Sequence, residues 1–132
     1  MILLDTVVVS EFRKARPSPK VVSWLRLVRE NDLYLSVVTL GEIERGIARA
    51  RDEVVRARLE GWLEDTMRRY ADRILDVTPA IARRWGRWSA ELGHDGADLL
   101  IAATAFVHGM TVATRNVRHY APTGVATIDP FV

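Results

Sequence analysis

The chain has 132 residues, of which 19 are Lys or Arg, 17 are Asp or Glu, 3 are His and none is Cys. The lack of Cys excludes disulfides, thiolate chemistry and every zinc site that uses Cys ligands. No apolar run approaches the roughly 20 residues of a membrane-spanning helix, and the start of the chain lacks the basic segment of a secretory signal. We therefore expect a cytoplasmic protein with no membrane partner and a single domain over residues 1–132.

The first half of the chain alternates between short apolar runs and helical periodicities. Residues 2–4 form a short buried strand that ends at Asp5, and a helix starts at Ser18-Pro19 with apolar side chains at helical spacing. A second strand is predicted over 33–38, followed by a helix that Thr39 opens. The seam of apolar side chains between Val55 and Tyr70 predicts one long helix.

The second half continues the same alternation. A third strand over 74–77 leads to a helix that starts at Thr78-Pro79. Residues 99–107 are apolar on every side, which predicts a deeply buried helix that Gly109 ends. The last two predicted strands cover 110–113 and 125–128. Strands separated by helices predict an α/β domain with three layers, α/β/α, around a four- or five-stranded, mainly parallel sheet.

Three carboxylates and one amide stand at the junctions of these elements. Asp5 follows the first strand, Glu42 lies near the start of the helix after the second strand, Asp98 opens the apolar helix, and Asn116 follows the 110–113 strand. In parallel sheets, functional sites lie beyond the carboxyl ends of the strands, so these side chains can converge. Clustered oxygen ligands without Cys or paired His suit Mg²⁺, with Mn²⁺ as a substitute, and such a site suits phosphoryl transfer.

Each of these residues also has a purely structural interpretation. Glu42 lies three residues after Thr39, and this spacing is that of a helix capping box. Asp98 favours the dipole of its helix, Asp5 can cap the next segment, and Asn116 is typical of a turn. The signal is stronger jointly than singly, because acids occur at three separate junctions.

Basic side chains occur next to two of these positions. Arg13 and Lys14 follow the Asp5 segment, and Arg115 and Arg118 flank Asn116. Basic groups around an acidic metal site are candidates for holding flanking phosphates. A solvated, solubilising loop explains them equally well.

Four segments together resemble the PIN-domain ribonuclease toxins of the VapC family, in its FitB-like branch. They are MILLDTVVVSE at 1–11, LSVVTLGEIERGI at 35–47, ADLLIAATAFVHGMTVATRN at 97–116 and GVATIDPF at 124–131. The resemblance covers the whole chain, so it implies a single PIN-like domain. It implies a Mg²⁺-dependent endoribonuclease that acts as the toxin of a bacterial type II toxin–antitoxin pair and leaves 5′-phosphate and 3′-hydroxyl ends.

The resemblance also assigns roles and partners. Asp5, Asp98 and Glu42 match the metal-binding acids, Asn116 matches a fourth position, and Thr6 and Thr114 support the site. The implied partners are RNA, a second copy in a homodimer, and a VapB-like antitoxin that blocks the site; DNA is bound only indirectly, through the antitoxin. The resemblance identifies neither the RNA that is cut nor the number of metal ions.

One departure from the family pattern bears on activity. The family usually has Asp-Thr-Asn after the first strand, whereas this chain has Asp5-Thr6-Val7. Loss of that amide can weaken the support of Asp5. The alternative function is therefore a catalytically weakened PIN-like module that acts mainly as an antitoxin-binding co-repressor. A receiver-like phosphoacceptor role for Asp5 is disfavoured, because no acidic pair stands at the first strand.

Overall fold

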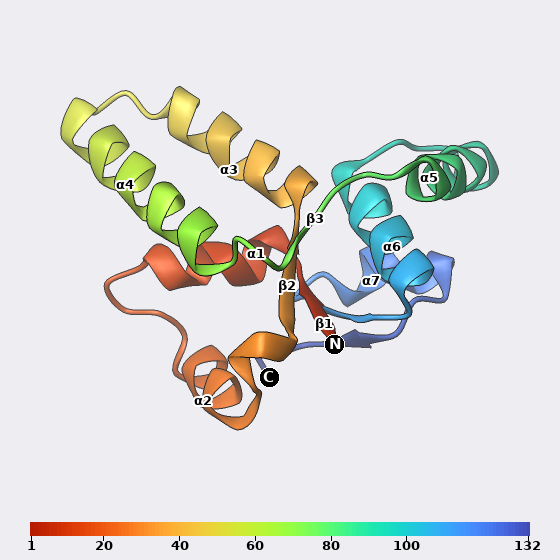
Figure 1. Ribbon diagram of the computed structural model, residues 1–132, viewed down its shortest axis with the longest axis horizontal. Helices are drawn as coiled ribbons and strands as arrows, with labels where there is room; N and C mark the ends of the chain where they lie inside the picture. The colour runs from red at the N-terminus through yellow and green to blue at the C-terminus, as the bar shows by residue number, and fades with distance from the viewer.

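The computed structural model describes residues 1–132 and contains one five-stranded sheet with helices on both faces (Figure 1). The strands are β1 (Ile2–Leu4), β2 (Leu33–Ser36), β3 (Ile74–Leu75), β4 (Thr111–Ala113) and β5 (Thr127–Ile128). Their order is β3-β2-β1-β4-β5, and every neighbouring pair is parallel. Parallel neighbours need a crossover connection, which the helices supply. The predicted parallel α/β/α fold is confirmed.

The helices form two groups on either side of the sheet (Figure 1). They are α1 (Thr6–Val9), α2 (Pro19–Leu27), α3 (Val37–Arg49), α4 (Glu53–Arg69), α5 (Pro79–Leu92), α6 (Ala97–His108) and α7 (Val117–Tyr120), with short 3-10 helices at Ser10–Arg13, Glu30–Asp32 and Ala121–Thr123. The α3–α4 pair projects as an arm from one side, while α5 packs against α6 on the other. None of these helices combines the length and the apolar character needed to cross a lipid bilayer.

The core consists of two hydrophobic clusters, one on each face of the sheet. Leu3 lies in the cluster that includes residues of α5 and α6, whereas Leu4 lies in the cluster that includes residues of α1, α3 and α4. Successive side chains of a strand point to opposite faces. Because each face carries one of the two clusters, both leucines are fully buried. The central strand is thus held from both sides, which fixes the position of Asp5 at its carboxyl end.

Helix α3 begins earlier than the sequence pattern predicts. The strand predicted over 33–38 ends at Ser36, whose hydroxyl accepts a hydrogen bond of 3.0 Å from the backbone N–H of Val38 and caps the helix. Thr39 is therefore the third residue of α3 and does not open it. Val37 and Val38 have strand propensity, but capping by Ser36 and packing of the helix decide their conformation.

Other element boundaries differ by a few residues. The strands predicted over 74–77 and 125–128 are two residues long, and β4 begins at Thr111. Gly109 ends α6 in the left-handed conformation (φ 67°), as predicted. The prediction that the apolar helix is deeply buried is confirmed for most of α6 as far as Ala105. Phe106 and Val107 at the end of the helix are exposed.

Candidate metal-binding active site

Asp5 occupies the carboxyl end of β1 and caps the short helix that follows. Its Oδ1 accepts a hydrogen bond of 2.8 Å from the backbone N–H of Thr6, and its Oδ2 accepts one of 2.7 Å from the hydroxyl of Thr114. Thr114 follows β4, the parallel neighbour of β1, so both residues leave the sheet at the same edge. Asp5 is only 5% exposed. Its carboxylate is therefore fixed in position from two strands.

Glu42 is held in the same region by a threonine from another element. The hydroxyl of Thr6 lies 2.6 Å from Oε1 of Glu42 and 3.0 Å from the hydroxyl of Thr39. A hydroxyl has one proton, and the shorter contact to a carboxylate indicates that Thr6 donates to Glu42 and accepts from Thr39. The capping-box interpretation of Glu42 is wrong, because α3 starts at Val37 and Glu42 lies in its second turn.

Asp98 and Asn116 approach the site from α6 and from the loop after β4. Asp98 is the second residue of α6, and its Oδ2 lies 3.2 Å from Nδ1 of His119 on α7. The backbone N–H of Asn116 donates to the hydroxyl of Thr114 at 2.9 Å, while the Asn116 side chain makes no capping hydrogen bond. The amide side chain of Asn116 is thus left available to the site.

A cleft of about 430 Å³ contains all four side chains that the sequence predicts to converge. Asp5, Glu42, Asp98 and Asn116 line it, together with Thr6, Val7, Ala97 and His119. The predicted convergence at one edge of the sheet is confirmed in that all four side chains line the same cleft. The acids do not make one tight cluster, however, since no three acidic or histidine side chains are grouped closely enough to form a ready-made metal cage.

The electrostatics of the cleft centre on Asp5. Burial raises the pKa of the Asp5 carboxyl, the hydrogen bonds from Thr114 and Thr6 oppose this shift, and the negative charge of Asp98 adds to it. The hydroxyl of Tyr120 lies close enough to contribute as well. Tyr120 is fully buried, and its hydroxyl faces Asp5 without forming a well-aligned hydrogen bond. Burial, together with the neighbouring Asp5, raises the pKa of the phenol well above its usual value.

Sequence analysis misses His119 and Tyr120. The three histidines are scattered along the chain with no ligand spacing, and Tyr120 has no motif around it. The available signal is their position within four residues of Asn116, which places them on the first turns after the β4 edge. Only the packing of α7 against α6 brings them to Asp98 and Asp5.

The four basic candidates divide into two pairs. Lys14 forms an ion pair of 2.8 Å with the buried carboxylate of Glu11, and the guanidinium of Arg115 lies 3.9 Å from the centre of the Phe131 ring. Arg13 and Arg118 are exposed and form no ion pair. The second pair is therefore free to meet an anionic ligand, whereas the first has partners within the chain.

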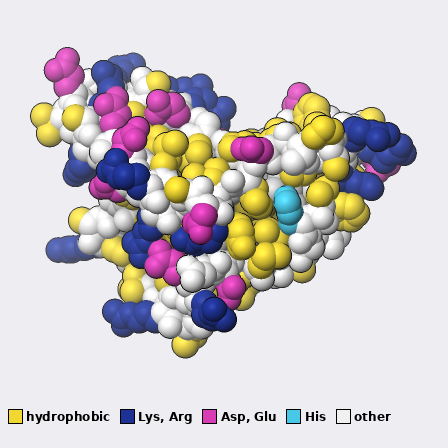
Figure 2. Space-filling view, viewed as in Figure 1, with side chains coloured by type: hydrophobic (Ala, Val, Ile, Leu, Met, Phe, Trp, Pro, Cys, Tyr) yellow, Lys and Arg dark blue, Asp and Glu magenta, His cyan; other side chains and the backbone are white.

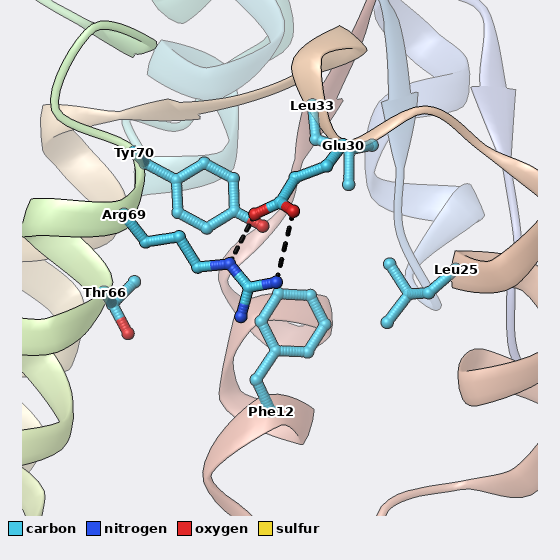
Figure 3. Close-up of a pocket in the computed structure, with 7 residues that line it drawn as sticks. All are labelled: Phe12, Leu25, Glu30, Leu33, Thr66, Arg69 and Tyr70. Atoms are coloured by element: carbon cyan, nitrogen blue, oxygen red, sulfur yellow. Dashed lines mark hydrogen bonds and ion pairs between the residues drawn. The ribbon is translucent and has the colours of Figure 1, made fainter.

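Another pocket, of about 260 Å³, lies at the opposite end of the sheet (Figure 3). The bidentate ion pair of Arg69 with Glu30 lies inside it, between Phe12 and Tyr70 (Figure 3). Glu30 precedes β2 and Arg69 precedes β3, so this pocket faces the amino ends of the strands. It contains none of the converging acids, and we do not assign catalysis to it.

The donor atoms of the cleft fit a hydrated divalent cation. Carboxylate and amide oxygens are ligands of Mg²⁺ and Mn²⁺. The buried Asp5 has no cationic partner within the chain, and the nearby negative charge of Asp98 adds to its need for one. Because Mg²⁺ keeps several waters and is commonly held by one or two carboxylates, it does not require a three-residue cage.

Comparison with known proteins places this geometry in a family. The family model for the PIN domain matches residues 2–124. The chain belongs to the PIN-domain family. It is 34% identical to "VapC ribonuclease Y4jK" of Sinorhizobium fredii, over 99% of this chain and 98% of that protein. It is also 34% identical to "Toxin FitB" of Neisseria gonorrhoeae, over 99% of both chains.

The similarity to solved structures extends over the whole fold. The PIN domain of this chain superimposes on a chain of the structure of FitAB bound to an IR36 DNA fragment with a TM-score of 0.88. The match has 34% identity and covers 100% of this chain and 96% of the other. The chain is therefore a PIN-domain homologue of VapC and FitB toxins, as its resemblance to the VapC family implies.

Proposed function

We propose that this PIN domain is a divalent-metal-dependent endoribonuclease that acts as the toxin of a toxin–antitoxin pair. The observation that carries the proposal is the convergence of Asp5, Glu42, Asp98 and Asn116 on one cleft at the carboxyl edge of the sheet. The homologues named VapC ribonuclease and Toxin FitB supply the reaction class. The substrate is an RNA phosphodiester, and the metal is Mg²⁺, with Mn²⁺ as a substitute.

Asp5 and Asp98 would hold the metal, directly or through water. Asp5 is preorganised for this by Thr114 and the Thr6 N–H, so it needs no reorientation. His119 holds Asp98 from the solvent side. When bound, Mg²⁺ supplies Lewis-acid chemistry, polarising the phosphate and lowering the pKa of water.

Glu42 and Asn116 complete the site from its two sides. Glu42 keeps one carboxylate oxygen on the Thr6 hydroxyl, and its other oxygen lies 3.8 Å from the exposed Arg45. Glu42 would bind the metal through water or orient the attacking water, and Asn116 would support the opposite side with its amide. Arg13 and Arg118 would hold flanking phosphates.

The test is RNA cleavage by the free protein in Mg²⁺, compared with Asp5→Asn and Asp98→Asn. We expect each substitution to reduce cleavage by at least 100-fold. Asp95→Asn is the matched control, because Asp95 is exposed and lies three residues before Asp98 without lining the cleft. Equal rates in the wild type and both cleft variants would reject the proposal.

The proposed partners are a VapB-like antitoxin and a second copy of the chain. Among the homologues, FitB occurs in the FitAB complex with DNA, and we infer that this chain likewise meets DNA only through its antitoxin. Phe106 and Val107 are exposed at the end of α6 and leave apolar surface for a homodimer contact. Light scattering of the isolated protein at micromolar concentration tests the dimer, and a monomer there contradicts it.

The catalytically weakened alternative depends on Val7, and the contacts of Asp5 do not favour it. Val7 lines the cleft, as Asp5 and Thr6 do. Both oxygens of Asp5 nevertheless have donors from Thr6 and Thr114, so the position of this carboxylate does not depend on an amide at residue 7. We therefore keep the active nuclease as the proposed function.

A further inference from the structure

A hollow of about 230 Å³, which we call the Trp62 hollow, adjoins the acidic cleft. It shares Thr6 and Glu42 with the cleft, so a group bound in it lies immediately next to the carboxylates. Side chains of α3 and α4 give it an apolar lining that includes Ile47 and Trp62. The proposed roles of the acids do not use this space.

Gly46 of α3 also lines the Trp62 hollow and adds no side chain to it. A Cβ atom at this position would meet no other atom within 4 Å. Glycine within a helix is unfavourable compared with other residues, and here neither a positive φ nor a close neighbour requires it. The space next to Gly46 is therefore available to a ligand.

The remaining lining has the chemistry of a nucleotide site. Trp62 is half-buried and offers an aromatic surface on which a base can stack. Arg13 is exposed at the hollow and has no ion pair, so it can meet a backbone phosphate. Ser10 and Thr6 add hydroxyl groups that can contact the polar edge of a base.

We propose that the Trp62 hollow is a subsite for one unpaired nucleobase of the RNA, adjacent to the phosphodiester in the acidic cleft. The proposal rests on the proposed nuclease function and adds a base-binding site to it. In this subsite the base lies against Trp62, and Arg13 contacts the phosphate of the same or the next nucleotide. A base inside a duplex cannot enter, because both of its faces are stacked on neighbours.

Continuity with the cleft favours a base over a protein side chain as the occupant. The hollow and the cleft form one path through Thr6 and Glu42, and a polynucleotide places a base beside every phosphate. An aliphatic side chain would fill the apolar part but would make no use of the adjoining Arg13 guanidinium. A nucleotide satisfies both parts.

The test fills the hollow without disturbing the helix. Gly46→Leu places a side chain in the open space and raises helix propensity, so the variant is expected to fold. Gly61→Leu is the matched control, since Gly61 lies within α4, also has open space at Cβ, and does not line the hollow. The probes are adenosine 5′-monophosphate and ribose 5-phosphate, which differ only by the base. Titrations in Mn²⁺, followed by calorimetry and tryptophan fluorescence, give their affinities.

We expect the wild type and Gly61→Leu to bind the nucleotide about 10-fold more tightly than ribose 5-phosphate. Gly46→Leu should bind both probes equally. Equal affinities for both probes in the wild type, or an unchanged preference in Gly46→Leu, would overturn the subsite. If Gly46→Leu instead escapes inhibition by a co-expressed antitoxin while nucleotide binding is unchanged, the hollow is a protein-docking site and the proposal is wrong.

These measurements do not require cleavage, so they separate the subsite from the proposed function. A protein that shows base-dependent binding sensitive to Gly46→Leu but does not cleave RNA retains the subsite and loses the nuclease assignment. A protein whose cleavage depends on Asp98, and whose Gly46→Leu and Gly61→Leu variants cleave decamer RNA with the same KM, retains the nuclease and loses the subsite.

Discussion

The hydroxyl of Tyr120 faces the carboxylate of Asp5 inside the protein, close enough to act on it as a weak donor but outside the geometry of a well-formed hydrogen bond. Few buried polar groups in folded proteins lack a good partner, so such a group calls for an explanation. The Tyr120 ring packs in the hydrophobic cluster with Leu3 and Val112. The core thus holds a phenol hydroxyl against Asp5, where it favours the charged form of this carboxylate.

We predict that Tyr120→Phe separates stability from metal binding. Removal of a poorly paired buried hydroxyl should leave the metal-free protein as stable as the wild type or more stable by about 1 kcal/mol. The rise in Tm on addition of Mn²⁺ should become smaller, because Asp5 loses a neighbouring hydroxyl that favours its charged form. Thermal unfolding with and without Mn²⁺ measures both effects. Tyr34→Phe is the control, since Tyr34 is a partly buried tyrosine packed against the same cluster. A less stable metal-free variant with an unchanged Mn²⁺ effect would contradict the prediction.

Asp5 should make the metal-free protein less stable at neutral pH. Burial raises its pKa in the folded state above the ordinary value of 3.8, so the folded state binds the proton more tightly than the unfolded state. The free energy of unfolding contributed by this group therefore falls as pH rises from about 3.8 through the folded pKa. We predict that Asp5→Asn raises the free energy of unfolding at pH 7 by about 1 kcal/mol, and that the gain shrinks below pH 4.

Urea unfolding in EDTA at pH 7 and below pH 4 measures this difference. Asp95→Asn serves as the control, because Asp95 is an exposed acid outside the cleft. A destabilised Asp5→Asn variant with the same deficit at both pH values would show that the carboxylate matters as a hydrogen-bond acceptor for Thr114. The prediction that the buried charge of Asp5 destabilises the folded protein would then be wrong.

The convergence of the acids could be predicted because it depends on topology. Parallel strands expose their carboxyl ends at one edge, and Asp5, Glu42 and Asp98 each stand near a junction that the apolar pattern marks. The sequence pattern does not predict which side chains donate hydrogen bonds to each acid. Thr6 pairs with Glu42 across 36 positions of sequence, and Thr114 pairs with Asp5 across 109. No local spacing encodes such contacts.

The error at α3 and the ion pairs of the α3–α4 arm have a common physical origin. Propensity places Val37 and Val38 in a strand, but the Ser36 cap places them in a helix. On the arm, acidic and basic side chains are interspersed over the surface (Figure 2). There, Arg69 of α4 pairs with Glu30 of another element, although Asp65 stands four residues before it on the same helix. In each case the actual partner is decided by contacts that a linear pattern does not contain.

We predict that Thr6 positions Glu42 through its hydroxyl. Thr6→Val removes the donor at 2.6 Å and leaves Glu42 free to turn toward Arg45, so RNA cleavage should fall by about 10-fold. Thr6→Ser keeps the hydroxyl and should retain most of the activity. Thr104→Val is the matched control, because the Thr104 hydroxyl bonds the carbonyl of Leu100 within α6. If Thr6→Val keeps the wild-type activity, or if Thr6→Ser loses as much activity as Thr6→Val, the hydroxyl of Thr6 alone does not account for the role of this residue.

The last prediction concerns Val7→Asn, which restores the residue that the VapC family usually has at this position. One hydrogen bond to each oxygen already fixes the position of Asp5, so a further amide is not needed to orient this carboxylate. We expect cleavage and Mn²⁺ affinity to change by less than about 3-fold, which corresponds to less than about 0.7 kcal/mol. Calorimetric titration with Mn²⁺ beside a cleavage assay measures both quantities. A rise of 10-fold or more in either would mean that Val7 impairs the site, and the co-repressor function would then become the better account of this chain.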